Sequence, residues 1–222
     1  MFFIIKVIER NGCMDICKLE RLVKFIESRE EKVTSAFRFR DGAFSLTGEK
    51  LTKSGVDSIS DMTCKGDKIL DVGVGKGLAL DMFKSMGLEV TGISLNQDEI
   101  DDAVTEGHDV RRMDMSFMDF DDETFDVLWS RHSLEHSLFP FFTLHEFKRV
   151  LKPNGVLYVE VPAPNTKNNN EHNTQHFSVF LDQQWVSLIR RSGFKLISGI
   201  AMKIGTIDIY YRFIAKKNGS IS

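Results

Sequence analysis

The sequence predicts an α/β protein built on a doubly wound, mostly parallel sheet with helices on both faces. Two observations support this fold class: short apolar segments alternate with segments of helical period from residue 68 to 162, and a glycine turn follows the first apolar segment. Units this short favour parallel pairing, and the right-handed crossover rule places helices on both faces. Strands are expected at 68–72, 88–95, 108–113, 125–130 and 156–162, and helices at 78–87, 99–107 and 141–151.

Each expected element has its own local signals. "KILDV" is a short apolar strand, and the helix "LALDMFKSMG" ends at Gly87, where glycine is a common C-terminal stop. The polar residues "NQDE" open the helix at 99–107 after the second strand, "LEVTGISL". The tripeptide "PNG" is expected to turn the chain into the fifth strand, "VLYVEVP".

The flanking regions are less regular. Apolar residues at helical spacing predict one amphipathic helix over 15–32, whereas "FRFRDGAFSLTGEK" is mixed and turn-rich and allows no assignment. The asparagine-rich 165–173 predicts a loop, followed by a helix at 181–193 and a closing pair of strands at 194–203 and 206–217. The sequence thus predicts seven strands in a single domain over 1–222.

Composition narrows the function classes. The chain has 222 residues, 42% hydrophobic and 27% charged, with a net charge of −3. An acidic pI of about 6.1 argues against a nucleic-acid partner. Cys13, Cys17 and Cys64 form no paired motif, which suits a reducing cytoplasm and structural roles. No apolar run is long enough for a membrane span. The segment "MFFIIKVIER" favours a short strand or docking segment over a secretory signal. The sequence does not indicate an oligomeric state.

The glycine turn, "GVGKG" at 73–77, follows a strand that ends at Asp71, an arrangement typical of nucleotide-binding folds. The dinucleotide fingerprint fails, because Leu78 stands where its third glycine belongs and Ser94 ends the second strand without the expected acid. The phosphate-binding loop also fails, because Lys76 precedes the last glycine. The turn therefore indicates a nucleoside ligand without phosphates.

Four motifs in register resemble those of the class I S-adenosylmethionine-dependent methyltransferases. "ILDVGVGKG" resembles the first motif and "VTGISLNQDEI" the second-strand motif, while "MDMSFMDFDDETFDVLWS" and "LHEFKRVLKPNGVLYVEVP" resemble the later blocks, from Lys68 to Pro162. The resemblance implies a Rossmann-like methyltransferase fold with S-adenosylmethionine as cofactor. It also implies an N-terminal helical cap at 1–60, a cofactor-binding core at 66–162, and an acceptor loop with closing helix and strands at 163–222.

The resemblance also implies a set of cofactor-binding residues. Asp71 would accept from the methionine ammonium, the backbone of Gly73 and Gly75 would lie against the cofactor, and Asp114 would accept from the adenine amino group. The full set of cofactor-binding residues is Asp71, Gly73, Gly75, Ser94, Leu95, Asn96, Asp114, Met115 and Ser130.

One position departs from the family pattern. The family usually has an acid that binds the ribose hydroxyls where this chain has Ser94. Asn96 or Gln97 would take over part of that hydrogen bonding, and loss of the charge could weaken cofactor binding by about 1–3 kcal/mol. The segment "GISLN" is also similar to the cyclopropane fatty acid synthase branch of the superfamily.

The stretch "RHSLEH" contains His-x-x-Glu-His, the spacing of an inverted zinc-protease motif. A zinc hydrolase would need a third ligand, for which composition offers Glu146, Glu160 and Glu171. The related methyltransferases carry Leu-Glu-His directly after the fourth strand without any metal, and this resemblance accounts for the stretch. The sequence therefore indicates no metal and argues against a zinc hydrolase.

The expected reaction is methyl transfer to a small-molecule acceptor such as a sugar, a lipid or another metabolite, at oxygen or nitrogen. A hydroxyl acceptor needs a base, and His132, His136 and His176 are the candidates, with capping or packing as the alternative role of each. The chain lacks the Asn-Pro-Pro-Tyr and Pro-Cys motifs of nucleic-acid methyltransferases. A cyclopropane-synthase-like enzyme and a non-catalytic S-adenosylmethionine-binding subunit are the alternatives.

Overall fold

The computed structural model describes residues 19–26, 28, 46–205 and 208–218. The chain forms two compact units, Met1–Arg38 and Phe39–Ser222. In the first unit residues 19–26 are helical, which agrees with the helix expected at 15–32. The expected segment "MFFIIKVIER", Cys13 and Cys17 lie outside the described residues, and the prediction of a single domain over 1–222 stays a prediction.

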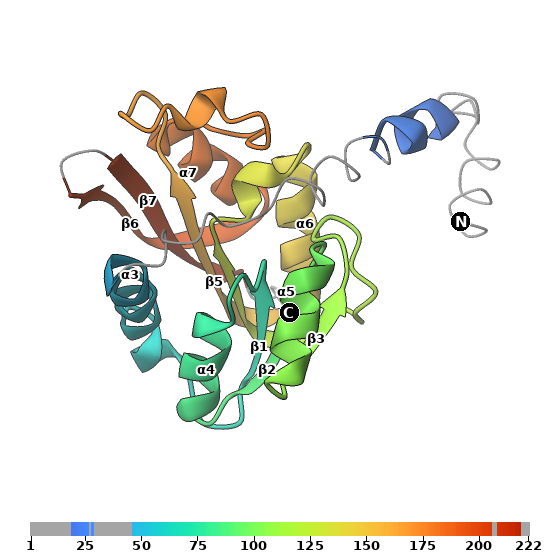
Figure 1. The fold of residues 1–222 in the computed structure, drawn as a ribbon, viewed down its shortest axis with the longest axis vertical. Helices are drawn as coiled ribbons and strands as arrows, with labels where there is room; N and C mark the ends of the chain where they lie inside the picture. The colour runs from blue at the N-terminus through green and yellow to red at the C-terminus, as the bar shows by residue number, and fades with distance from the viewer. Residues whose placement is uncertain (1–18, 27, 29–45, 206–207, 219–222) are drawn as a thin grey trace. The chain divides into compact units, whose positions relative to one another are not determined.

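The second unit contains a seven-stranded sheet with the order β3-β2-β1-β4-β5-β7-β6, which confirms the predicted fold class (Figure 1). Neighbouring strands from β3 to β5 pair in parallel, and β7 pairs antiparallel with both β5 and β6. The strand order reverses between β1 and β4, and such a switch point opens a ligand crevice at the carboxyl ends of the strands. The strands are β1 Lys68–Val72, β2 Glu89–Ser94, β3 Asp109–Arg112, β4 Phe125–Arg131, β5 Leu151–Pro162, β6 Phe194–Ile204 and β7 Asp208–Lys217.

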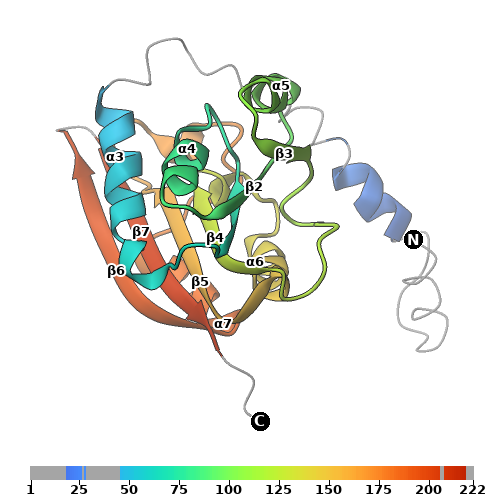
Figure 2. The same ribbon diagram turned by 90° about the horizontal axis from the view of Figure 1, so that it is seen from below.

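Helices cover both faces of the sheet (Figure 2). On one face, α3, α4 and α5 contribute the buried side chains Val56, Phe83 and Ile100 to the apolar clusters beneath them. On the other face, α6 and α7 contribute Phe147 and Trp185. The helices are α3 Leu46–Asp57, α4 Leu78–Ser85, α5 Gln97–Thr105, α6 Pro140–Val150 and α7 Asp182–Arg191, with short 3₁₀ helices η1 Ser60–Met62, η2 Leu134–His136 and η3 Asn170–His172.

Helix α3 is the element that the sequence analysis could not assign. Its docking depends on Gly55, because a Cβ atom there would lie 2.5 Å from the Tyr158 hydroxyl and 2.6 Å from the Trp129 ring. Those two rings stack at 3.8 Å between centroids, and Phe83 packs edge-on against Trp129. The close approach of helix and sheet is therefore set by a glycine in the helix and by aromatic side chains from distant strands, which local periodicity does not reveal.

Strand β5 is longer than predicted. The "PNG" segment, expected as a turn before the strand, lies inside Leu151–Pro162, with Asn154 in the left-handed region at φ 64°. The pairing register with β4 shifts between Phe125 and Val127, which is the signature of a bulge. The turn residues therefore produce a local irregularity in a continuous strand.

Two further expectations concern compartment and membrane. Cys64 is exposed and is a free thiol. Among the described helices, none has the length and apolar character that crossing a bilayer requires.

Candidate active site

The glycine turn lies at the carboxyl end of β1 and leads into α4. Gly73, Gly75 and Gly77 all have positive φ angles, of 80°, 52° and 75°. A Cβ atom at Gly73 would collide with the hydroxyl of Ser133, which itself donates to the Val72 carbonyl at 2.6 Å. The turn is therefore tightly held against the segment that follows β4, and its backbone can approach a ligand as only glycine allows.

Asp71 is the buried acid of this turn. Asp71 is 2% exposed, and its Oδ2 atom has no hydrogen-bond partner among the described residues. Burial, and then the charge of Glu99, raise the pKa of Asp71 to about 8, while Arg131 opposes the rise. A buried acid that lacks a partner is costly unless a ligand completes its hydrogen bonding, so Asp71 fits a ligand that brings an ammonium group.

Glu99 is a candidate site residue that the sequence did not reveal. Ser94, at the end of β2, donates to Glu99 Oε2 at 2.8 Å, and the backbone N–H of Gly75 donates to the same carboxylate. Burial raises the pKa of Glu99, and these two hydrogen bonds oppose the rise. The chain thus has a carboxylate beside Ser94 after all, brought in from the first turn of α5.

The two residues expected to replace the missing acid are engaged elsewhere. The side chain of Asn96 caps α5 by accepting from the Asp98 N–H at 3.0 Å, and Gln97 donates to Asp101 at 2.7 Å on the exposed side of the helix. Leu95, between Ser94 and the cap, is half-buried. These contacts favour Glu99 over Asn96 or Gln97 as the polar group at this end of β2.

The expected adenine and methionine contacts lie at the ends of neighbouring strands. Asp114 follows β3, and its Oδ1 accepts from the Ser116 N–H at 2.7 Å, while the half-buried Met115 packs against the core. Ser130 lies in β4 opposite Val72 of β1 and is fully buried, and its hydroxyl lacks a hydrogen-bond partner within the described ranges. Asp71 and Ser130 therefore place two unsatisfied polar atoms on adjacent central strands, as a polar ligand at this crevice would require.

"RHSLEH" forms the end of β4, the junction and η2. His132 has a left-handed backbone at φ 54°, and its N–H donates to the Glu160 carbonyl at 2.8 Å. Its ring nitrogens lie 3.4 Å from Glu135 and 3.7 Å from Glu160, and its ring packs edge-on against Tyr210. A strained residue held between two carboxylates is typical of functional sites.

His136 and His176 come together from segments far apart in the sequence. Their ring centroids are 5.0 Å apart in an edge-to-face arrangement. His136 Nδ1 lies 2.9 Å from the Gln175 carbonyl, and His176 Nδ1 lies 3.0 Å from the Asn170 carbonyl. Burial lowers the pKa of His176, which favours its neutral ring. The structure therefore gathers all three predicted histidines around Glu135.

Glu135 is the buried centre of this group. It is 1% exposed, its Oε2 atom has no hydrogen-bond partner in the described part of the chain, and its backbone carbonyl accepts from the Ser178 N–H at 2.9 Å. Burial would raise the pKa of Glu135, but the hydrogen bond from His132 and the charges of His136 and His132 hold it below its usual value. Glu135 is thus held as an anion.

The three acids considered as zinc ligands have other partners. Glu146 binds Arg149 at 3.0 Å, and Glu171 accepts from the Asn165 N–H at 3.1 Å. Glu160 is fully buried and accepts from Arg131, Arg212 and Tyr158. The carboxylate that lies beside the histidines is instead Glu135, the glutamate of the His-x-x-Glu-His motif itself.

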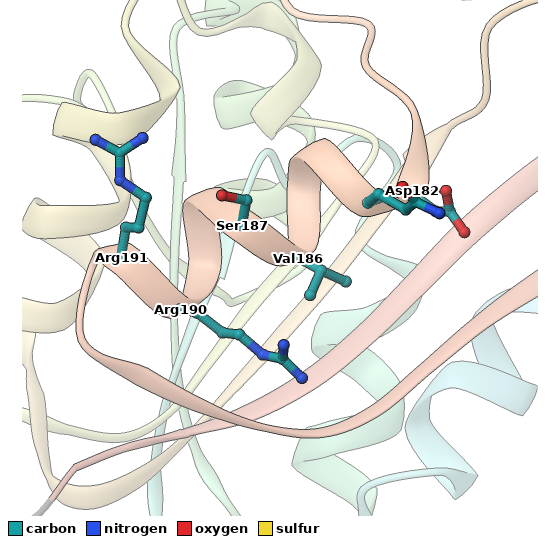
Figure 3. A pocket seen from close by; sticks show the side chains of 6 residues that line it. Asp182, Val186, Ser187, Arg190 and Arg191 are labelled. Carbon is teal, nitrogen blue, oxygen red and sulfur yellow. Dashed lines mark hydrogen bonds between the residues drawn. The ribbon is translucent and has the colours of Figure 1, made fainter.

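A hollow elsewhere on the surface contains none of these residues. It has a volume of about 510 Å³ and is lined by α7, and Figure 3 shows Asp182, Val186 and Arg190 around it. The candidate site is therefore defined by the strand ends and not by this hollow.

Comparison with known proteins shows similarity to methyltransferases. Residues 70–159 match the family model of a methyltransferase domain. The chain is 30% identical over 135 residues to 27-O-demethylrifamycin SV methyltransferase of Amycolatopsis mediterranei, covering 54% of this chain and 50% of that protein. It is 32% identical over 104 residues to a ubiquinone biosynthesis O-methyltransferase of Actinobacillus pleuropneumoniae, covering 42% and 44%. The chain thus spans half or less of the length of these curated relatives.

Solved structures extend the likeness to most of the chain. The 1,6-didemethyltoxoflavin-N1-methyltransferase of Burkholderia thailandensis, with its substrate and S-adenosylhomocysteine, gives a TM-score of 0.69 at 19% identity and covers 88% of this chain and 89% of that one. The [4+2]-cyclase SpnF gives a TM-score of 0.69 at 20% identity and covers 90% and 95%. Residues 70–159 thus match a methyltransferase domain, and the fold and the glycine turn with its buried acid are similar to those of the class I S-adenosylmethionine-dependent methyltransferases.

Proposed function

We propose that this chain transfers a methyl group from S-adenosylmethionine to a hydroxyl oxygen of a small-molecule acceptor. The observation that carries the proposal is the pair of carboxyl groups at the glycine turn, Asp71 and Glu99, beside a second polar cluster around Glu135. A ligand with an ammonium group, a sulfonium and a ribose complements the first pair in charge and hydrogen bonding. The second cluster supplies groups that can take a proton from an acceptor.

The residues of the turn would hold the cofactor along the strand ends. Asp71 would accept from the ammonium, the backbone of Gly73 and Gly75 would lie against the chain of the cofactor, and Asp114 would accept from the adenine amino group. When bound, S-adenosylmethionine supplies an electrophilic methyl group on a good leaving group. The main task of the protein is then alignment, which can contribute about 7–11 kcal/mol.

Glu99 would take the place of the acid that the family usually carries at position 94. A carboxylate offers about four acceptor sites. Ser94 and the Gly75 N–H use two of them, which leaves capacity for both ribose hydroxyls. The Ser94 hydroxyl then holds the carboxylate in place as a positioning group.

The acceptor would meet the histidines on the other side of the methyl group. As the oxygen attacks, its proton must leave. The groups of this cluster that could accept the proton are His132, His136 and His176. Oxygen is favoured over nitrogen because a neutral amine needs no base before attack, whereas a hydroxyl does. The relatives include enzymes that methylate oxygen and enzymes that methylate nitrogen, so the choice of oxygen rests on the histidines alone.

Titration calorimetry with S-adenosylhomocysteine tests the cofactor part, with NAD as the control. Binding of the first and not the second is expected, and the absence of binding would contradict the proposal. Turnover is then tested with methyl-labelled S-adenosylmethionine and a panel of hydroxylated metabolites. Label in unsaturated phospholipid would instead indicate a cyclopropane-synthase-like enzyme, and tight cofactor binding without turnover on any acceptor would indicate a non-catalytic subunit.

A further inference from the structure

The proposed reaction needs a single base, for which His132 suffices, and Glu135, His136 and His176 then remain as a group of metal-ligating side chains. One ligand atom from each lies within 4.8 Å of the others. Two imidazoles and one carboxylate are the protein ligands of many catalytic zinc sites and of non-haem iron sites. We propose that these three side chains bind a divalent transition-metal ion of the zinc class, which coordinates the acceptor oxygen.

The imidazole tautomers suit this role. A backbone carbonyl can only accept a hydrogen bond, so Nδ1 of His136 must donate to Gln175 and Nδ1 of His176 must donate to Asn170. The proton on Nδ1 leaves the lone pair of each ring on Nε2. Metal-binding histidines almost always have this support, with the distal N–H fixed by a carbonyl or carboxylate.

The carboxylate divides its two oxygens between two tasks. Glu135 Oε1 lies 3.4 Å from His132 Nδ1, whereas Oε2 is buried without a hydrogen-bond partner within the described residues. A buried carboxyl oxygen without a hydrogen-bond partner is costly, and a cation beside that oxygen removes the cost. Oε2 is therefore the atom we assign to the metal.

The ligands need a modest closure to bind an ion. Metal bonds of about 2.0–2.1 Å in a tetrahedral site put the ligand atoms about 3.4 Å apart. The three ligand atoms lie within 4.8 Å of one another, so side-chain rotations that move each atom by about 1 Å would bring them to metal-binding distance. Asn173, whose amide lies 3.1 Å from His176 Nε2, is exposed and can turn away when a metal takes that lone pair.

Three protein ligands leave one position of a tetrahedral ion open. This proposal rests on the proposed function: the acceptor hydroxyl occupies that position and loses its proton to Nε2 of His132. That nitrogen lies 3.7 Å from Glu160 Oε1. The oxygen then forms its bond to the methyl carbon, the carbon–sulfur bond breaks, and the electron pair remains on sulfur. His132 is left as the imidazolium, held between Glu135 and Glu160.

Metal binding is measured directly, without any acceptor. The full-length protein is stripped with a chelator and titrated with Co²⁺, whose visible absorption reports tetrahedral coordination, and the Zn²⁺ content is measured by elemental analysis. One equivalent is expected for the wild type. His176→Ala and Glu135→Gln should each weaken binding by more than about 100-fold, since removal of even an outer hydrogen bond costs 10–100-fold.

His172→Ala is the matched control, since His172 is an exposed histidine of the same loop. It should bind as tightly as the wild type, and an equal loss in this variant would indicate surface binding and overturn the proposal. S-adenosylhomocysteine binding by each variant verifies folding. A wild type that binds S-adenosylhomocysteine but no metal would overturn the metal site and leave the proposed function intact. Metal uptake without S-adenosylhomocysteine binding would overturn the proposed function, and with it the role of the metal in methyl transfer, but not the metal site itself.

Discussion

The role of Glu99 in binding the ribose can be tested by removing its charge alone. Glu99→Gln keeps the shape and one acceptor oxygen but loses the anion that accepts from Ser94 at 2.8 Å. Hydrogen bonds to a charged group contribute about 1.5–3 kcal/mol, which corresponds to about 10- to 150-fold in affinity. Because Glu99 is half-buried and screened in part, we expect the lower part of that range.

The structure also predicts which end of the cofactor reports the change. The charge of Glu99 raises the pKa of Asp71, so its removal favours the Asp71 carboxylate and does not weaken contact with an ammonium. The loss should therefore appear with ribose-bearing ligands. The loss is measured by calorimetry with 5′-methylthioadenosine, which should bind Glu99→Gln more weakly than the wild type. Its 2′,3′-dideoxy analogue lacks the ribose hydroxyls and should bind both proteins with the same affinity.

Asp98→Asn is the matched control, because Asp98 is the exposed neighbour in the same first turn of α5. Its affinity for S-adenosylhomocysteine should stay within about twofold of the wild type, as for most surface changes. Ser94→Asp added to Glu99→Ala should restore part of the affinity, since it returns an acid to the end of β2. An affinity of Glu99→Gln within twofold of the wild type would refute the reasoning.

Three further predictions concern the buried charges and the docking of α3. The pKa of Asp71 is raised to about 8, so between about pH 4 and 8 the folded state holds this proton while the unfolded state releases it, and stability falls as pH rises through that window. Asp71→Asn should therefore raise Tm at pH 8, and it should abolish S-adenosylhomocysteine binding. An unchanged Tm would count against the raised pKa. Arg212→Met leaves the fully buried Glu160 without one of its two arginines and should cost about 3–5 kcal/mol in urea denaturation, whereas a loss below about 1 kcal/mol would contradict the assigned burial of the pair. Gly55→Ala should destabilise the chain by about 1–3 kcal/mol despite the better helix propensity of alanine, because its Cβ would overlap Tyr158 and Trp129, and the exposed Lys50→Ala serves as the control in the same denaturation assay.

The order of strands and helices around the glycine turn could be predicted because its signals are local. Period-two and period-3.6 apolar patterns, the glycines at 73–77 and the polar start of α5 each lie within a few residues of the element that they specify. The predicted strands are all present, and both the parallel order and the closing antiparallel pair follow the expected fold class. The family motifs depend on the same short stretches, which is why the resemblance to the family could be recognised from the sequence.

Other features depended on contacts between distant segments. Helix α3 could not be assigned because its place on the sheet depends on Gly55 meeting Trp129 and Tyr158, more than seventy residues away. The "PNG" segment was expected as a turn before the strand, and it lies between Leu151 and Val156, which pair with β4 on either side of a register shift within β5.

The site itself divides along the same line. The sequence by itself indicated the turn, Asp71 and the three histidines as candidate site residues, since residue type and motif position suffice for these. Only the tertiary structure decided that Glu99 lies beside Ser94 and that His176 lies against His136 and Glu135, forty residues earlier in the chain. The physical reason is that hydrogen bonds and charge interactions act over a few ångströms in space, and the separation of two residues in the sequence does not set their distance in the fold.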